Sequence, residues 1–218
     1  MEQEQAVPAS ALSGAADGRT PALGELAMKL AAGADPDAIV LVEGASDQNA
    51  LEALAERRGR NLEAEGVLIV PMGGATTIGH YLDLVGPAGF DVKLAGLCDV
   101  GEEGDFRRGL ERSGVGSNLD RPAMEDLGFF VCVADLEDEL IRALGTDRVE
   151  AVIEAQGETG TFRLMQKQPA QRERARDAQL RRFMGTRAGR KVHYARLLVE
   201  AVDLASIPRP LDGVLASV

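Results

Sequence analysis

Short runs of aliphatic residues recur along the chain, and each is followed by a more polar stretch. The runs cover residues 38–42, 67–70, 92–98 and 128–133. Continuous aliphatic runs of this length, rich in β-branched residues, are typical of strands buried on both faces of a parallel sheet. The pattern therefore predicts four strands.

Segments with helical spacing alternate with these runs. We expect helices at about 22–32, 46–58, 77–85 and 103–113. Residues 137–204 also read as helical, with breaks near Gly157, Gly160, Pro169 and Gly185. Strands alternating with helices predict an α/β fold with a parallel sheet of about four strands flanked by helices, and a helical C-terminal extension.

The same pattern suggests how the chain is divided. Residues 1–21 are rich in Ala, Gly, Pro and Ser without periodicity, and are predicted to be a flexible tail. Residues 22–145 are predicted to form the α/β domain, and residues 146–218 the helical extension.

Composition narrows the class of protein. The chain has 218 residues, 45% of them hydrophobic, and no apolar run long enough to span a bilayer. The first residues carry Glu2 and Glu4 where a signal peptide needs positive charge. Cys98 and Cys132 lie in apolar runs, as buried thiols of a reducing compartment do. We therefore expect a cytoplasmic protein without a membrane partner.

Charge is distributed unevenly along the chain. The net charge is −11, which by itself argues against a nucleic-acid partner. Residues 163–191, however, contain ten basic and two acidic residues and carry a net charge of +8. We call this stretch the basic segment. It is either a solvated helix face or a surface that binds a polyanion.

Acidic residues follow three of the four predicted strands. Ligand sites of open parallel sheets lie outside the carboxyl ends of the strands, so these side chains are expected at one edge of the sheet. Clustered carboxylates repel one another unless they are protonated or bridged by cations, and oxygen ligands suit Mg²⁺ and Mn²⁺. Taken singly, each acid could instead cap a helix. The residues concerned are Glu43, Asp47, Asp99, Glu102, Glu103, Asp105, Asp135, Glu137 and Asp138.

Motifs of other enzyme classes are absent from the sequence. There is no G-x-x-x-x-G-K-[ST] phosphate-binding loop, and Gly73-Gly74 lacks the following lysine. No G-x-G-x-x-G follows the first predicted strand, and no G-x-S-x-G accompanies the two histidines. These absences argue against a P-loop ATPase, a dinucleotide-binding enzyme and a serine hydrolase.

The acidic strand ends resemble those of a known family. The sequence VLVEGASD at residues 40–47, LCD at residues 97–99 and DLE at residues 135–137 together resemble the TOPRIM domain of topoisomerases, primases and OLD (overcoming lysogenization defect) nucleases. The DLE sequence and Lys191 make the OLD branch the most similar, over about residues 37–205.

This resemblance implies a Mg²⁺- or Mn²⁺-dependent DNA endonuclease, a hydrolase that uses two ions. Glu43 and Lys191 are implied as catalytic residues, the lysine stabilising charge on phosphate. The implied metal ligands are Glu43 and Asp99, with Asp135 and Glu137 for a second cation. From their positions after the strands we expect Asp47 and Glu103 to be metal ligands as well. DNA contacts are expected from Arg172, Arg176, Arg181, Arg182 and Lys191 of the basic segment.

Two features depart from the family pattern. TOPRIM proteins usually carry Asp-x-Asp on the third strand, whereas this chain has Asp99-Val100-Gly101. We expect Glu102 or Glu103 to replace the missing acid, and Asp105 to serve its helix instead. OLD nucleases also carry an ATPase domain ahead of the TOPRIM domain, and this chain resembles the nuclease half alone.

These departures define the alternatives. The main rival is a TOPRIM-like module that binds DNA or a separate ATPase without cleaving. A phosphoacceptor domain modified at Asp99 is less well supported, because no fifth strand with its lysine is visible. A homodimer and a separate ATPase are the protein partners left open, as is the choice between DNA and RNA.

Overall fold

The computed structural model describes residues 21–187 and 189–218. Its centre is a sheet of four parallel strands: β1 (Ala38–Val42), β2 (Val67–Pro71), β3 (Lys93–Asp99) and β4 (Phe129–Cys132). All four predicted strands are confirmed, and the α/β fold class with them. The predicted flexible tail lies outside the described residues except for Pro21, which begins a helix.

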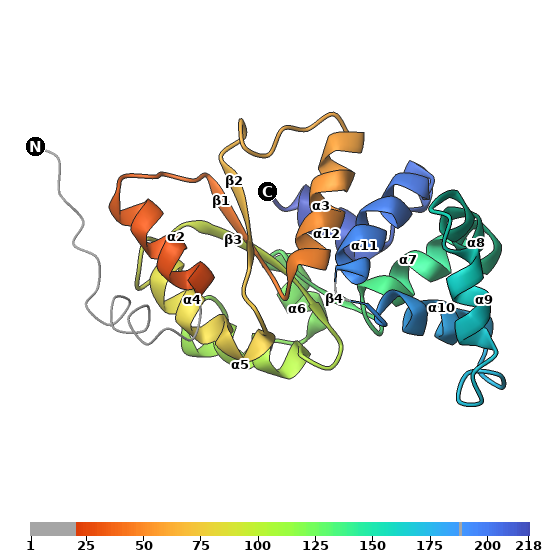
Figure 1. The fold of residues 1–218 in the computed structure, drawn as a ribbon. Coiled ribbons are helices and arrows are strands. Elements are labelled where there is room, and N and C mark those ends of the chain that lie inside the picture. Colours follow the sequence, from red (N-terminus) through yellow and green to blue (C-terminus); the bar gives the residue numbers. More distant parts are fainter. Residues whose placement is uncertain (1–20, 188) are drawn as a thin grey trace, which may run out of the picture.

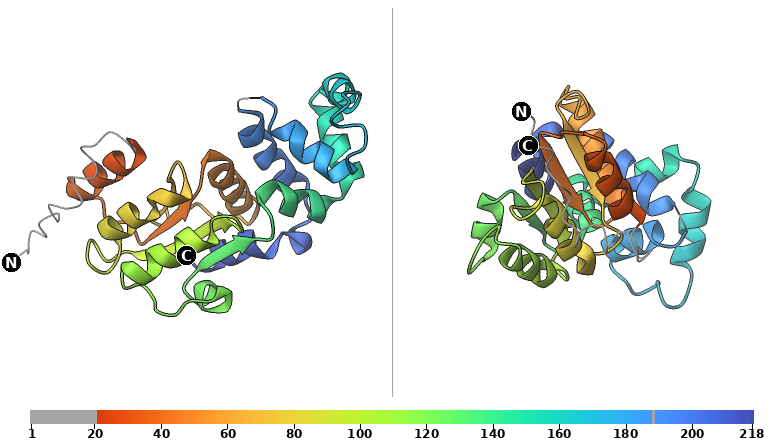
Figure 2. Two further views of the ribbon diagram at one scale, coloured as in Figure 1. Left: turned by 90° about the horizontal axis from the view of Figure 1, so that it is seen from below. Right: turned by 90° about the vertical axis from the view of Figure 1, so that its left-hand side faces the viewer.

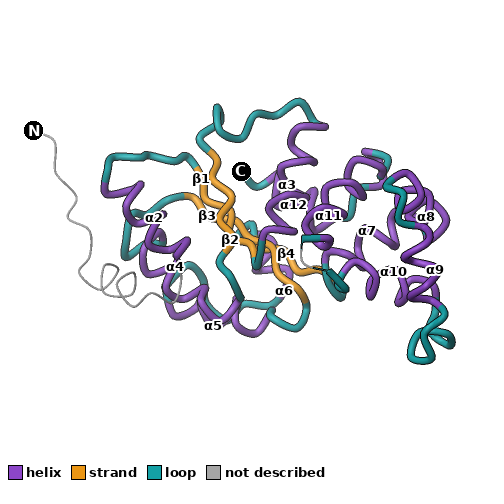
Figure 3. Tube along the Cα trace, in the orientation of Figure 1, coloured by secondary structure: helices purple, strands orange, loops and turns teal. Residues whose placement is uncertain are grey.

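The strand order is β2-β1-β3-β4 (Figures 1 and 3). The chain passes from β1 to β2 on one side and then returns to place β3 on the other side of β1. The crevice between β1 and β3 is therefore the topological switch point of the sheet, where open α/β sheets bind ligands. Val42 of β1 lies opposite Leu97 of β3 in the register.

Helices cover both faces of the sheet. On one face lie α2 (Pro21–Ala31), α4 (Ile78–Val85), α5 (Glu103–Arg112) and α6 (Arg121–Asp126), around a core that includes Ile39, Leu41 and Phe129. On the other lie α3 (Ala45–Arg57) and α12 (Arg209–Ala216), and the core there includes Val40, Val42 and Leu97. Figure 2 shows these two layers from two further directions.

The C-terminal helices continue the second core. They are α7 (Leu136–Leu144), α8 (Thr146–Ala155), α9 (Thr159–Gln166), α10 (Arg176–Met184) and α11 (Arg190–Ala201). Leu180, Tyr194 and Leu198 belong to the same buried cluster as Val40 and Leu54. Helix α11 packs against α3, so it is held beside the carboxyl end of β1.

The edge strand β2 has few free backbone donors. Met72 N donates to Val42 O over 2.8 Å, so by the two-residue period of a strand Leu68 and Val70 also turn their amides toward β1. The outward-facing residues are then Val67, Ile69 and Pro71. Val67 N donates to Leu62 O over 2.8 Å, and proline has no N–H. Ile69 is left as the single outward amide of the strand.

Within residues 21–187 and 189–218, no helix is both long enough and apolar enough to cross a bilayer. Cys98 and Cys132 are buried free thiols, as expected. Burial is the main reason that both thiol pKa values are raised above their usual range.

Candidate metal centre

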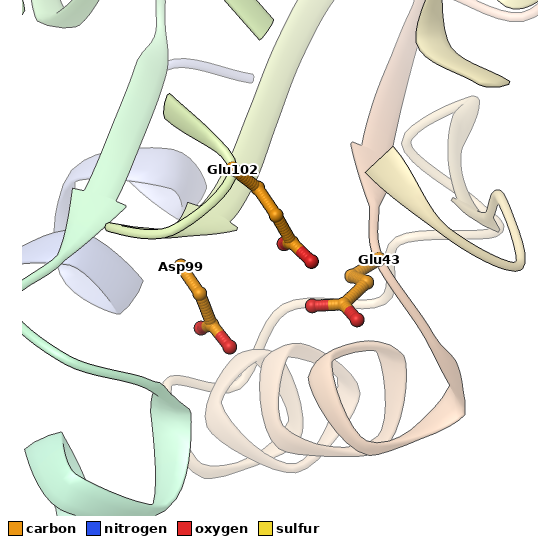
Figure 4. Close-up of side chains that lie close together, drawn as sticks. All are labelled: Glu43, Asp99 and Glu102. Atoms are coloured by element: carbon orange, nitrogen blue, oxygen red, sulfur yellow. The ribbon is translucent and has the colours of Figure 1, made fainter. Parts of the chain in front are cut away.

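Three carboxylates meet at the switch point of the sheet. Glu43 follows β1, Asp99 ends β3, and Glu102 precedes α5. One carboxylate oxygen from each lies within 4.8 Å of the others, and Figure 4 shows the three side chains converging. We call Glu43, Asp99 and Glu102 the carboxylate cluster.

A tight turn brings Glu102 to the cluster. Glu102 N donates to Asp99 O over 3.0 Å, which closes a four-residue turn around Val100 and Gly101. The turn points Glu102 back toward the strand that carries Asp99. Oε2 of Glu102 is buried and accepts no hydrogen bond from the described residues. An oxygen of this kind is suited to a cation, since a buried acceptor without a partner is costly.

Two carboxyl groups of the cluster, those of Asp99 and Glu102, have raised pKa values. Burial raises the pKa of Asp99 to about 7, and Asp47, Glu43 and Asp135 add to the shift by repulsion. Burial raises the pKa of Glu102 to about 7 as well, with Glu43 beside it as the next cause. A cation at this position would replace those protons and relieve the repulsion.

Glu103, one of the two residues expected to replace the missing acid, points elsewhere. Its Oε2 accepts from Arg121 Nη2 over 2.7 Å and from Arg121 Nε over 2.9 Å. The structure therefore brings Glu102, and not Glu103, to Glu43 and Asp99. Asp105 pairs with Arg108 on its own helix, in line with the helix role expected for it.

Asp47 lies one helical turn after Glu43 and is buried. Its Oδ2 accepts from Gly44 N over 2.9 Å and so caps α3. Burial raises the pKa of Asp47 to about 6. The structure does not include this side chain among the three oxygens that converge, but its charge reaches both Glu43 and Asp99.

A second acidic pair begins α7. Asp135 caps the helix, because its Oδ1 accepts from Asp138 N over 2.9 Å. Glu137 is only 3% exposed, and its Oε2 contacts Lys191 Nζ at 3.2 Å. Its Oε1 is buried and has no hydrogen-bond partner among the described residues. Burial is the main cause of the raised pKa of Glu137. Asp135 and Glu137 thus form a pair separate from the carboxylate cluster.

Lys191 connects the two acidic groups. Burial alone would lower its pKa, but Glu137, Asp47 and Asp99 outweigh that effect and the pKa is raised. The ammonium is therefore charged, and it acts on both the carboxylate cluster and the acidic pair. Helix α11 places it there through its packing on α3.

The arginines that were predicted to bind DNA differ in whether they already have partners within the described residues. Arg181 Nε donates to Asp135 Oδ2 over 2.5 Å. Arg176 contacts Asp147 at 2.8 Å and Glu150 at 2.7 Å, and Arg172 Nε donates to Lys167 O over 2.7 Å. Arg182 is exposed and, within the described residues, the structure records no ion pair for it.

Two residues of the basic segment differ from expectation. Arg190 is buried, pairs with Glu158 at 2.7 Å and stacks on the ring of Phe183 at 4.2 Å, so it stabilises the helical region instead of facing solvent. Arg174, which was not among the expected DNA contacts, lines a cavity with Arg181, Arg182 and Lys191. Charge density alone could not separate these two arginines.

Known proteins supply an independent comparison. Residues 36–100 match a family described as the TOPRIM domain of overcoming lysogenization defect protein-like proteins. The chain contains an OLD-like TOPRIM domain. The matched range holds β1, β2 and β3 together with Glu43, Asp47 and Asp99. It ends one residue before Gly101.

Solved structures extend the likeness beyond that domain. The C-terminal region of the Burkholderia pseudomallei OLD protein has a TM-score of 0.65 at 20% identity, over 84% of this chain and 96% of that one. The C-terminal region of the Xanthomonas campestris pv. campestris OLD protein gives 0.65 at 22% identity, over 84% and 91%. At these identities the likeness establishes the shared fold. No curated protein matches the chain.

Proposed function

We propose that the protein is a metal-dependent DNA nuclease of the OLD-like TOPRIM type. The observation that supports this most is the convergence of Glu43, Asp99 and Glu102 at the switch point, with an unpartnered buried oxygen on Glu102. Three carboxylates this close suit Mg²⁺ or Mn²⁺. The unpartnered Oε1 of Glu137 supports a second cation at the acidic pair.

In this proposal each of the two acidic groups binds its own cation. Glu43, Asp99 and Glu102 would hold one cation, and Asp135 with Glu137 the other. Cations at such positions orient the attacking water and offset charge on the attacking and leaving oxygens. Lys191 Nζ carries a fixed positive charge between the groups and would hold a non-bridging phosphate oxygen. Glu43 would accept the proton of the attacking water.

Binding of a cation would also change the protonation of the cluster. Asp99 and Glu102, both with a pKa of about 7, are partly protonated in the metal-free protein at neutral pH. Those protons leave when the carboxylates become ligands. Asp99 and Glu102 would then both be ionised.

Plasmid cleavage tests the proposal. We expect supercoiled DNA to be nicked or linearised with Mg²⁺ or Mn²⁺, and cleavage to stop with a chelator. Asp99→Asn should abolish it, while Glu103→Gln, the matched neighbour paired with Arg121, should retain it. If wild type and Asp99→Asn show the same residual activity, the cleavage comes from a contaminant and the proposal fails.

One observation favours a second candidate, a binding module without cleavage. Gly101 stands where the family usually has its second Asp, and no side chain at that position can ligate. Such a module would bind DNA or a separate ATPase and leave plasmid intact with either metal. Gly101→Asp would then create cleavage that the natural chain lacks.

A further inference from the structure

A charged cavity of about 360 Å³ lies next to the acidic pair. Two acidic and four basic side chains line it, together with Ala178 and Gly185. The charged residues are Asp135, Glu137, Arg174, Arg181, Arg182 and Lys191. Glu137 is only 3% exposed, and it contributes the Oε1 that has no partner among the described residues.

Two of the four basic side chains already have partners in the cavity. Arg181 contacts Oδ2 of Asp135 through Nε at 2.5 Å and also through Nη2. Lys191 contacts Oε2 of Glu137 at 3.2 Å. These are the same carboxylates that would hold the second cation. A cation and these two basic groups therefore compete for the negative charge of the same two carboxylates, although Oε1 of Glu137 is not contacted by Lys191.

From this overlap we infer an exchange that couples cation binding to phosphate binding. When Asp135 and Glu137 bind a divalent cation, Arg181 and Lys191 leave them and bind a phosphodiester group in the cavity, with Arg174 and Arg182. The inference rests on the proposed function, and it assigns the cavity as a phosphate site that opens only in the metal-bound protein.

Physical reasoning sets the sign of the coupling. Without the cation, Arg181 and Lys191 neutralise Asp135 and Glu137, and their donors are directed at carboxylates. Once they are released, their donors can form charge-assisted hydrogen bonds to phosphate. Binding linkage is reciprocal, so phosphate must strengthen cation binding by the same factor. The protein would then hold its second cation firmly only when DNA is present.

Sulfate binding to the metal-free protein tests the release of Arg181. Sulfate is used as the phosphate mimic because it does not precipitate Mn²⁺. Asp135→Asn keeps the helix cap, since Asn caps as well as Asp, but removes the charge that holds Arg181. Asp138→Asn is the matched control: it removes one charge from the same turn, where Asp138 pairs with Arg142.

Sulfate affinity in the presence of EDTA, followed by NMR at the Arg181 side chain, should rise about three- to tenfold in Asp135→Asn, the size expected for one freed ion pair. It should change less than twofold in Asp138→Asn. Equal affinities in the two variants would overturn the exchange.

Cation binding tests the same exchange from the other side. Arg181→Ala should bind Mn²⁺ at the second site about fivefold more tightly by calorimetry, because no guanidinium has to be displaced. Arg182→Ala, which lines the same cavity without a recorded ion pair, should change that affinity less than twofold. Wild-type affinity in Arg181→Ala would refute the proposal. Neither measurement uses DNA cleavage, so failure here leaves the nuclease assay unaffected, and failure of the nuclease assay leaves these results unaffected.

Discussion

Glu102 shows how a chain without the usual Asp-x-Asp can still bring three carboxylates together. The turn from Asp99 to Glu102 is closed by a backbone hydrogen bond, so the side chain three residues later returns to the strand end. Sequence reasoning reached Glu102 and Glu103 as candidates but could not choose between them. The choice depends on Arg121, which lies 18 residues beyond Glu103 and binds it.

Substitution of these two glutamates distinguishes them. We expect Glu102→Gln to weaken Mn²⁺ binding at least about tenfold, because a charged ligand is replaced by a neutral one; tenfold corresponds to about 1.4 kcal/mol. Glu103→Gln should leave metal affinity unchanged and cost about 0.2–1 kcal/mol of stability, as loss of a partly exposed ion pair does. Calorimetric titration and urea unfolding measure the two effects. The reverse order of affinities would place Glu103 in the site.

Gly101 offers a gain-of-function test. A Cβ at this position meets nothing within 4 Å, so a side chain can begin there without a clash at its first atom. We expect Gly101→Asp to restore most of the Mn²⁺ affinity that Glu102→Gln loses, when the two changes are combined. The double variant is compared with Glu102→Gln by the same calorimetry. No recovery would mean that position 101 does not face the cation.

Stability of the metal-free protein should fall as pH rises. Asp99 and Glu102 have folded-state pKa values of about 7, above their ordinary values near 4. Their protonation stabilises the fold fully below about pH 4, and this contribution is lost as pH rises through about 7. Urea unfolding in EDTA should therefore show lower stability at pH 7.5 than at pH 5. Asp99→Asn should flatten this dependence, and a profile equal to wild type would contradict the assignment.

At the scale of elements, the aliphatic runs predicted every strand of the described chain to within a few residues. Local signals were weaker for the short helices. The helix α6 was not predicted, and α12 was predicted only as part of the helical extension, although Asp120 caps α6 and a proline lies in the first turn of each helix. The helix break expected near Gly157 and Gly160 lies between α8 and α9, and Gly160 itself is the second residue of α9. Strand order was left open, because it depends on crossovers that periodicity does not encode.

Two helical glycines have opposite surroundings. In α12, a Cβ on Gly213 would lie 2.2 Å from the ring of Phe130 on β4, whereas in α9 a Cβ on Gly160 meets nothing within 4 Å. Gly213→Ala should therefore destabilise the protein by about 1–3 kcal/mol through overpacking. Gly160→Ala should stabilise it by about 0.4–1 kcal/mol. Thermal and urea unfolding provide the comparison, and a stabilising Gly213→Ala would show that α12 is not seated on β4.

For the molecule as a whole, internal pairs compensate about half of the basic segment: within the described residues, five of its ten basic side chains form ion pairs. Arg176 and Arg181 contact acids of α8 and α7, and Arg190 is buried. The sequence could locate the basic segment, but not which of its side chains are committed to other parts of the fold. That distinction needs the tertiary structure.

DNA binding should depend steeply on salt if the basic segment contacts phosphates. Each neutralised phosphate of duplex DNA contributes about −0.9 to the slope of log K against log salt. Arg182→Ala should therefore reduce the slope by about 0.9. Arg196→Ala serves as the control, because Arg196 pairs with Glu56 near the far end of α3 from Gly44. Fluorescence anisotropy at several salt concentrations measures the slopes, and equal slopes for both variants would exclude Arg182 from the interface.

The small number of free backbone amides on β2 affects how copies of this protein can associate. A sheet edge recruits another strand through alternating free donors and acceptors, and such edges are where proteins join into continuous sheets or fibres. On β2 the amide of Val67 is already engaged and Pro71 has none, which leaves Ile69 alone. Strand addition across this edge is disfavoured, so we do not expect copies of the protein to join there into a continuous sheet. The other edge strand, β4, is packed against by α12.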